Sequence, residues 1–471
     1  MPIFETGECV HEELDLLYGN NPAYDLECGY LVVPEDRDDP ASTLVRLPVV
    51  IFRTLNPNPK LDPVIYLAGG GGYDYLAVLR RDMEVVDAFL EERDFITYNQ
   101  RGAPGAEPSL ACPGYEEYQW EILGDASLSR EEADALNVEF LLECQDSLLQ
   151  QGIDLTKYNS AENAADANDL RMALSYEQAN YYGTSYGTRI ALALVRDFPE
   201  AVRSVILDSV YPPQVAYYSE YAFNTHRGFE RLFAACSADP DCSEGYPNLE
   251  ADFYRVAREL KADPITFHHD RGPLVLDGGF FIEAVSVHWY RPHLIPLMPR
   301  VIDRAARGIY TAVEDLLPLI IVPESCNWAT WQSIACREEV AFESYEDTLV
   351  LSEGLPPEVT EYYVDSFAAT EFALCESWQS GEADAIENQP VASHIPALVL
   401  AGEFDAITPP EWAKLTAETL SNSFYYAFPA MGHDIIWFNE CGLQIGLDFL
   451  DDPTTEPDSS CIDALPAVDF Q

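Results

Sequence analysis

Gly183-Thr184-Ser185-Tyr186-Gly187 joins a strand-like run at 179–182 to a helix-like run at 189–194. A G-x-S-x-G segment in that position places its serine in a strained strand-to-helix turn with positive φ, and the glycines avoid collisions with neighbouring backbone. This context predicts that Ser185 is a nucleophile. Because the helix begins at the serine, the backbone N–H of Tyr186 would point at any oxyanion that forms there. The alternative is a glycine-rich turn with an exposed serine, so the assignment depends on finding partners for Ser185.

Two later segments supply the partners that a serine nucleophile needs. Asp405 follows a buried strand-like run at 397–400, and His433 follows another at 423–428. The chain order is therefore Ser, Asp, His, each after a strand, which is the order of the α/β-hydrolase triad. His433 would act as general base and then general acid, while Asp405 would orient the imidazole and stabilise its charged form. A turn aspartate and a surface histidine are the alternatives, and Asp434 ranks below Asp405 as the acid because it is adjacent to His433.

A glycine-rich loop follows an early strand-like run at 63–67 and consists of Ala68, four glycines and Tyr73. The second backbone donor of an oxyanion hole comes from such a loop, because glycine lets the backbone approach a substrate closely. A phosphate-binding loop is the rival interpretation. It is disfavoured because no Lys-Ser/Thr follows the glycines and no G-x-G-x-x-G with a later acidic residue is present.

Several motifs spread along the chain form a set. They are the glycine-rich loop, the turn Asn99-Gln100-Arg101-Gly102, the G-T-S-Y-G segment, G-E-F-D-A-I-T-P-P at 402–410, P-A-M-G-H at 429–433 and the ending Pro457-Asp458-Ser459-Ser460-Cys461. The set resembles the prolyl aminopeptidase and tripeptidyl aminopeptidase group of α/β-hydrolases. The resemblance extends roughly from Cys28 to Cys461 and is least distinctive between Tyr211 and Gln389. It implies an exopeptidase that releases residues or short peptides from a free N-terminus.

The chain departs from that family in two motifs. The family's usual loop reads His-Gly-Gly-Pro-Gly, whereas this chain has Ala68 and Gly71 at the His and Pro positions, which predicts a looser loop. The usual Asp-Gln-Arg-Gly turn begins here with Asn99. Carried over position by position, the resemblance implies Gly70 as the first oxyanion donor from the loop and Gly71 as the second. It also implies that Arg101 is a structural residue that braces the loop.

The fold class that follows is α/β, with an α/β-hydrolase core, a mostly parallel central sheet, helices on both faces and a helical cap inserted late in the sheet. A core of ordinary size leaves roughly a hundred residues or more to place elsewhere. We expect residues 1–210 and 390–471 to form the catalytic core and residues 211–389 to form a mainly helical cap, or lid. Helix-like runs at 227–234 and 299–307, each with an apolar face, support that division.

The charge of the chain excludes several partners. The sequence has 26 Lys and Arg against 81 Asp and Glu, a formal net charge of −55. Such a surface repels nucleic acid and anionic membranes, and no apolar run is long enough to span a bilayer. A protein adapted to high salt, where screening relieves self-repulsion, and a secreted protein with an acidic bias are both compatible with this charge. We expect a monomer or homodimer with no nucleic acid or membrane partner.

Eleven cysteines indicate an oxidising compartment and hence a secreted, extracellular protein. The N-terminus has neither a basic nor an apolar signal region, so we interpret it as a mature start with a signal peptide removed and a Met added. Zinc would be the competing use of the cysteines. However, the chain has no C-x-x-C pair and His268-His269-Asp270 is typical of an exposed turn, so we expect no metal and no cofactor. The spacing suggests four local disulfides, Cys9–Cys28, Cys112–Cys144, Cys236–Cys242 and Cys441–Cys461, and leaves Cys326, Cys336 and Cys375 with one thiol over.

Substrate recognition is the least determined part of the sequence. An aminopeptidase binds a protonated amine, for which one or two carboxylates are the simplest partners. Glu220 from the cap and Glu403 beside the triad acid are candidates, as are Glu230, Glu371 and Glu376, although each is as readily a solvated surface group. We expect a peptide substrate. A carboxylesterase acting on small esters with the same triad is the alternative, and a non-catalytic binding protein on this scaffold is the alternative from another class.

Overall fold

The centre of the molecule is a nine-stranded sheet, seen in a computed structural model that describes residues 2–79, 83–317 and 326–470. The three pairings from β1 to β5 are antiparallel, and all the pairings from β5 to β11 are parallel. The predicted α/β class with a mostly parallel sheet is therefore confirmed. In sheet order the strands are β1 (Ile3–Thr6), β2 (Asp25–Pro34), β3 (Leu44–Arg53), β5 (Phe95–Tyr98), β4 (Val64–Leu67), β6 (Ala179–Thr184), β7 (Val202–Asp208), β10 (Ala397–Gly402) and β11 (Ser423–Phe428).

The central strands β4 and β10 form where the sequence is apolar without alternation. Every residue of β4, β6 and β10 is buried, as expected for parallel strands that are covered on both faces. At the edge of the sheet β11 is only partly buried. Two separate groups of buried side chains cover the two faces of the sheet.

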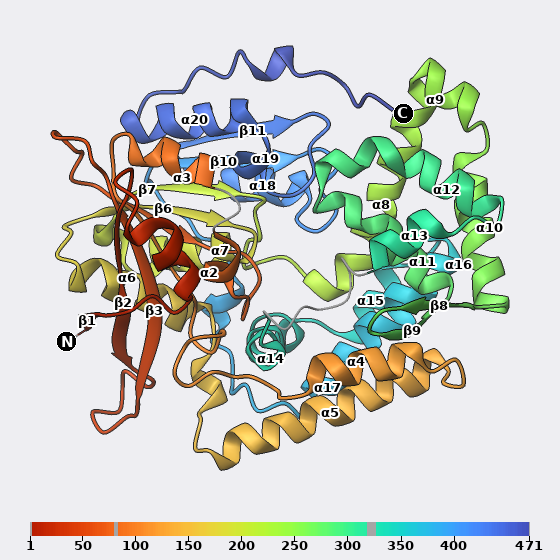
Figure 1. Ribbon diagram of the computed structural model, residues 1–471, viewed down its shortest axis with the longest axis horizontal. Coiled ribbons are helices and arrows are strands. Elements are labelled where there is room, and N and C mark those ends of the chain that lie inside the picture. Colours follow the sequence, from red (N-terminus) through yellow and green to blue (C-terminus); the bar gives the residue numbers. More distant parts are fainter. Residues whose placement is uncertain (1, 80–82, 318–325, 471) are drawn as a thin grey trace.

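Helices supply both of these layers (Figure 1). One apolar cluster joins the sheet to α6 (Ser160–Ala173), α7 (Tyr186–Asp197) and α18 (Pro410–Ala417). The other cluster joins it to α3 (Met83–Leu90) and α20 (Glu440–Asp451). The shorter helices of the core are α1 (Glu12–Leu14), α2 (Tyr75–Val78) and α19 (Ile435–Phe438).

Between β7 and β10 the chain forms a further set of helices, the cap, most of which lie on the right in Figure 1, with α14 nearer the middle. It has its own apolar core, in which Phe229, Phe253, Phe281 and Trp289 are buried together. The helices expected at 227–234 and 299–307 are parts of α8 and α12. Its elements are α8 (Tyr217–Ala238), α9 (Pro240–Gly245), α10 (Leu249–Ala262), the hairpin β8 (Ile265–His269) and β9 (Gly272–Leu276), α11 (Gly278–Ser286), α12 (Met298–Ala306), α13 (Thr311–Leu316), α14 (Trp328–Glu338), α15 (Tyr345–Leu351), α16 (Pro357–Tyr362) and α17 (Ala369–Cys375).

Two further helices, α4 (Tyr115–Gly124) and α5 (Arg130–Gln150), come from the segment between β5 and β6 but pack against the cap. Arg130 forms an ion pair with Asp277 at 2.7 Å, and Ser366 donates a hydrogen bond to Asp134. The structure thus adds a second segment to the cap side of the molecule. The expected division at residues 210 and 389 stays a prediction.

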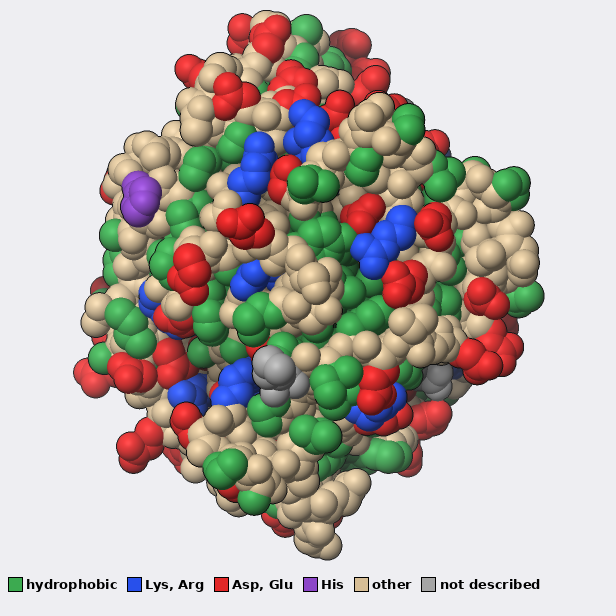
Figure 2. Space-filling view, turned by 90° about the vertical axis from the view of Figure 1, so that its left-hand side faces the viewer, with side chains coloured by type: hydrophobic (Ala, Val, Ile, Leu, Met, Phe, Trp, Pro, Cys, Tyr) green, Lys and Arg blue, Asp and Glu red, His purple; other side chains and the backbone are tan. Residues whose placement is uncertain are grey.

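Disulfides join segments in both the core and the cap. The four expected local pairs are confirmed, and Cys336–Cys375 is a fifth, which links α14 to α17. Cys326 is the free thiol. No helix among residues 2–79, 83–317 and 326–470 is both long and apolar enough to cross a membrane. Figure 2 shows acidic side chains spread over one face of the molecule, with Lys and Arg between them.

Arg101, in the turn after β5, holds several loops together from inside the core. Its side chain is fully buried and forms a bidentate pair with Asp166 of α6, at 2.7 and 2.8 Å. Its Nη1 also donates to the backbone carbonyls of Glu35 and Lys157. These contacts support the structural role that the sequence indicates for this arginine.

We expect Arg101→Met to destabilise the protein by about 3 kcal/mol, because it removes the bidentate partner of the buried Asp166 and leaves that carboxylate with Arg37 alone. Arg307→Met is the matched control, since Arg307 is 67% exposed and its ion pair with Asp303 lies at the surface. Urea denaturation of both variants measures the difference. Equal midpoints for the two variants would contradict the bracing role.

Candidate active site

Ser185 lies at the tight turn between β6 and α7. Its backbone has φ 54° and ψ −123°, which confirms the expected positive φ. A Cβ at Gly187 would overlap the carbonyl oxygen of Leu67 in β4, and a Cβ at Gly183 would overlap that of Gly187. Both glycines of the motif are therefore required by the close packing of α7 on the sheet.

Asp405 follows β10, and its carboxylate is saturated with hydrogen bonds. One oxygen accepts the backbone N–H groups of Ile407 and Thr408, both at 2.9 Å. The other oxygen accepts the Thr408 hydroxyl and faces Nδ1 of His433, both at 2.8 Å. A buried carboxylate held this way stays in one orientation, with its second oxygen against the imidazole. Thr408 was not anticipated from the sequence, although it belongs to the G-E-F-D-A-I-T-P-P motif.

His433 follows β11 and is 3% exposed. Burial disfavours its charged form, but the carboxylates of Asp405 and Asp434 outweigh burial and raise the pKa of His433 to about 9. Asp434 Oδ1 lies 3.9 Å from Nε2, the nitrogen opposite Asp405. In the described part of the chain no hydrogen bond joins Nε2 to Ser185. Catalytic hydrogen bonds are often long before substrate binds.

The loop that carries His433 is fixed from two sides. Asp208, at the end of β7, accepts the backbone N–H groups of Ile435 and Ile436, both at 2.9 Å. Burial, together with the nearby Asp434 carboxylate, raises the pKa of Asp208 to about 7. Sequence reasoning missed Asp208, although its position directly after a buried strand was the available signal.

The cap fixes the same loop through its backbone. The amide of His433 donates to the carbonyl of Trp289 at 2.7 Å, and a Cβ at Gly432 would overlap that carbonyl. The ring of Tyr290 lies 5.2 Å from the His433 ring, in an edge-on arrangement. The His433 side chain is thus held between core and cap.

The two segments that carry the expected oxyanion donors pass close to Ser185. Tyr186 is the first residue of α7, so its backbone N–H has no partner within the helix. The phenol of Tyr186 is buried, and its oxygen lies 3.0 Å from the hydroxyl oxygen of Ser160. In the glycine-rich loop, a Cβ at Gly69 would lie 3.0 Å from the Cβ of Ser185, so the loop passes directly over the serine. The donor roles of Gly70, Gly71 and Tyr186 stay predictions.

The two carboxylates singled out for substrate binding have partners within the protein. Glu220 accepts the indole N–H of Trp412 at 2.8 Å. Glu403 faces Arg231 at 3.6 Å and is partly exposed. These contacts favour a structural role for Glu220 and a surface role for Glu403.

Two other carboxylates lie inside the cap. Glu371 is buried, which raises its pKa to about 7, and its Oε2 has no hydrogen-bond partner among the described residues. Burial also raises the pKa of Glu283, whose Oε2 accepts the hydroxyl of Tyr363 at 2.8 Å. Tyr290 is close enough to interact electrostatically with Glu283 and with Asp405.

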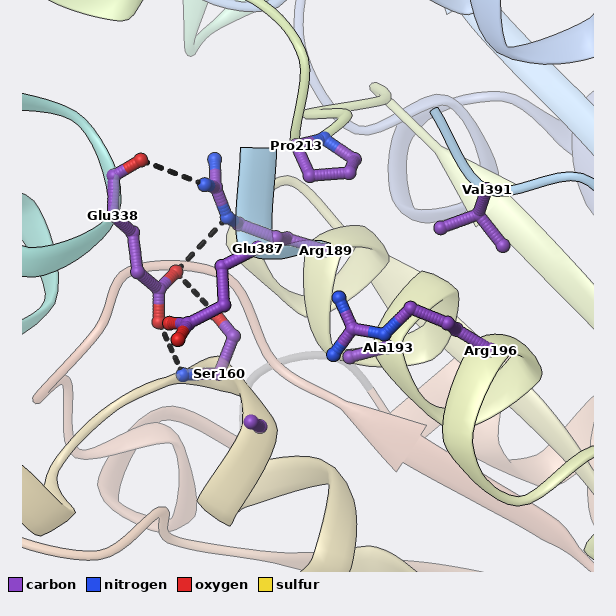
Figure 3. Close-up of a pocket in the computed structure, with 9 residues that line it drawn as sticks. Ser160, Arg189, Ala193, Arg196, Pro213, Glu338, Glu387 and Val391 are labelled. Atoms are coloured by element: carbon purple, nitrogen blue, oxygen red, sulfur yellow. Dashed lines mark hydrogen bonds and ion pairs between the residues drawn. The ribbon is translucent and has the colours of Figure 1, made fainter. Parts of the chain in front are cut away.

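A small pocket beside α7 is filled by an ion-pair network (Figure 3). Arg189 of α7 pairs with Glu338 of α14 at 2.9 Å, and Glu338 also accepts the hydroxyl of Ser160 at 2.6 Å. Ser185, Asp405 and His433 do not line this pocket. Among the described residues no three His, Cys, Asp or Glu side chains gather to hold a metal ion.

Comparison with known families and proteins gives consistent matches. A family model described as the alpha/beta hydrolase fold matches residues 62–273, and one described as TAP-like protein matches residues 360–461. The first range includes Ser185, and the second includes Asp405 and His433. Both ranges therefore contain the segments described above.

Curated relatives include serine protease Hip1 of Mycobacterium tuberculosis, 27% identical over 48% of this chain and 43% of that protein. The tripeptidyl aminopeptidase of Streptomyces lividans is 26% identical over 40% of this chain and 36% of that protein. The matches thus span less than half the length of these relatives. A solved thermophilic esterase from Thermogutta terrifontis is 16% identical, with a TM-score of 0.38 over 90% of this chain and 99% of that one.

Such a distant likeness to a solved esterase has no bearing on activity. Together with the sheet and its helices, the two family models show that the chain has the α/β-hydrolase fold and is similar to TAP-like proteins and to a serine protease.

Proposed function

We propose that this protein is a serine exopeptidase that cleaves residues or short peptides from free N-termini. The observation that carries the proposal is the buried Asp405–His433 pair, joined at 2.8 Å, in the loops that neighbour the Ser185 turn. A carboxylate on Nδ1 fixes the tautomer whose Nε2 can accept a proton, which is the arrangement a serine nucleophile requires. The disulfides are compatible with an extracellular site of action, which we include in the proposal.

In the proposed reaction, Ser185 Oγ attacks the scissile carbonyl while His433 takes the hydroxyl proton. The negative charge on the carbonyl oxygen is stabilised by the N–H groups of Tyr186 and of Gly70, with Gly71 as the second candidate from the loop. Collapse of the tetrahedral intermediate breaks the peptide bond, and His433 returns the proton to the leaving amine. Water then hydrolyses the acyl-enzyme by the same steps, which regenerates Ser185.

The cap carboxylates Glu283 and Glu371 would bind the protonated N-terminus of the substrate. A buried carboxylate without a cationic partner is costly, which is why burial raises the pKa of both groups. A substrate ammonium would supply the missing positive charge. This selection is what would separate an aminopeptidase from a carboxylesterase, whose small ester substrates carry no such charge.

We expect Ser185→Ala to lower kcat on a peptide anilide by roughly 10⁴-fold or more, because the remaining groups cannot form the acyl-enzyme. A fluorophosphonate probe should label the native protein and not the variant. Ser175→Ala, at another residue with positive φ, is the control and should retain activity. A Ser185→Ala protein that keeps most of its activity would refute the mechanism.

Glu371→Gln and Glu283→Gln should each lower kcat/KM roughly tenfold to a hundredfold for a peptide anilide with a free amine, because a charge-assisted hydrogen bond is lost. The same anilide with an acetylated amine should be unaffected. Glu376→Gln, at an exposed position one residue after α17, is the matched control. Equal effects on both substrates, or no preference of the native protein for the free amine, would favour the esterase instead.

The pH dependence should be alkaline, because His433 accepts a proton only when neutral. We expect kcat/KM to rise with pH with a midpoint of about 9, and Asp434→Asn to move the midpoint lower by removing one of the carboxylates that hold the proton. The groups that face His433 are Asp405, Asp434 and Asp208 together with Thr408 and Tyr290. Acetylated substrate keeps the titration of the substrate amine out of the profile. An unchanged midpoint in Asp434→Asn would contradict this assignment.

A further inference from the structure

A side chain from another segment fills the space beside Gly71 in the glycine-rich loop. This is the position where the family's usual loop has proline. A Cβ at Gly71 would overlap Cδ1 of Ile334, in α14 of the cap. It would also lie 3.4 Å from Trp331 and 3.6 Å from Tyr186. Gly71 is not among the glycines with positive φ, unlike Gly70, so its backbone would accept a side chain if space were free.

The start of α14 is bonded to the same loop. The backbone N–H of Asn327 donates to the carbonyl of Gly72 at 2.9 Å. Asn327 stands at the N-cap position of α14, yet its side chain does not cap the helix. Its Nδ2 donates instead to the carbonyl of Gly102 at 2.7 Å and to the hydroxyl of Ser109 at 2.8 Å. Asn327 is buried and, through its backbone and its side chain together, joins the glycine-rich loop to the turn that contains Arg101.

The other end of α14 is bonded to the helix that begins at the nucleophile. Glu338 pairs with Arg189 of α7 and with Ser160, as Figure 3 shows. Midway along α14, the ring of Trp331 lies edge-on to Tyr186, with centroids 6.3 Å apart. The helix thus contacts both segments that carry the expected oxyanion donors, and the Cys336–Cys375 disulfide anchors it to α17.

We propose that α14 positions the oxyanion hole and that Ile334 is its principal positioning residue. Glycine at position 71 gives the backbone more conformational freedom than proline would. With that freedom, the loop alone would not keep its N–H groups in a fixed direction. The Ile334 side chain occupies the space that residue 71 leaves empty and restricts the loop from the cap side. The inference rests on the proposed function, because it concerns the oxyanion hole of that reaction.

Exchanging the sizes of the side chains at positions 71 and 334 tests the positioning role of Ile334. Gly71→Ala should push the loop away from Ile334 and lower the second-order rate of fluorophosphonate labelling about 10- to 100-fold, within the range of losing one oxyanion donor. Ile334→Val, which removes the overlapping methyl group, should lower the rate about threefold to tenfold. The double variant should recover to within about threefold of the native rate, because the new methyl group takes the vacated space.

Steady-state kinetics and thermal unfolding accompany the labelling. A positioning role lowers kcat with little change in KM, whereas a purely structural role lowers the melting temperature and leaves the native fraction fully active. Ile302→Val is the matched control, since Ile302 is equally buried in the cap and belongs to α12. It should leave the labelling rate unchanged.

The outcomes separate the inference from the function on which it rests. Two outcomes would overturn the inference alone, provided that the native protein is labelled normally. In the first, Gly71→Ala leaves the labelling rate unchanged. In the second, the labelling rate of the double variant falls by the product of the two single effects. A native protein that takes up no probe would overturn the proposed serine chemistry and the inference with it. Recovery in the double variant supports both.

Discussion

The close approach of α7 to β4 is the constraint on which the site depends. The helix can pack against the carbonyl of Leu67 only because residue 187 has no side chain, and the same crossing forces Ser185 into its positive φ. A strained backbone conformation persists when the surrounding structure allows no other. Here the buried strands β4 and β6 hold the backbone of Ser185 in that conformation. One contact therefore sets three things: the position of the serine, the direction of the Tyr186 amide and the path of the glycine-rich loop.

The remaining groups are brought to that point by the edges of parallel strands. Asp405 and His433 follow β10 and β11, and Asp208 at the end of β7 holds the backbone beyond His433. Parallel strands bring residues that are distant in sequence to one edge of the sheet. The sheet itself therefore places Ser185, Asp405 and His433 at the same edge. Carboxylates gather there, and their combined field decides how tightly His433 holds its proton.

The sequence was sufficient for what depends on local pattern. The strand-to-helix turn at Ser185, the apolar runs of β4 and β10 and the four short-range disulfides are all readable from neighbouring residues. It was insufficient where a contact joins distant segments. The packing of α5 on the cap, the Ile334 side chain against Gly71 and the burial of Glu283 depend on how the chain returns on itself, and no local pattern reports that.

The cap is attached to His433 by its backbone as well as by its side chains. The carbonyl of Trp289 accepts the amide of His433, and the two backbones approach so closely that a Cβ at Gly432 would overlap that carbonyl. A lid that swung away as a rigid body would strip this partner from the base and disturb its alignment with Asp405. In the proposed reaction, a molecule in that open arrangement would be inactive, so substrate entry and hydrolysis would have to alternate.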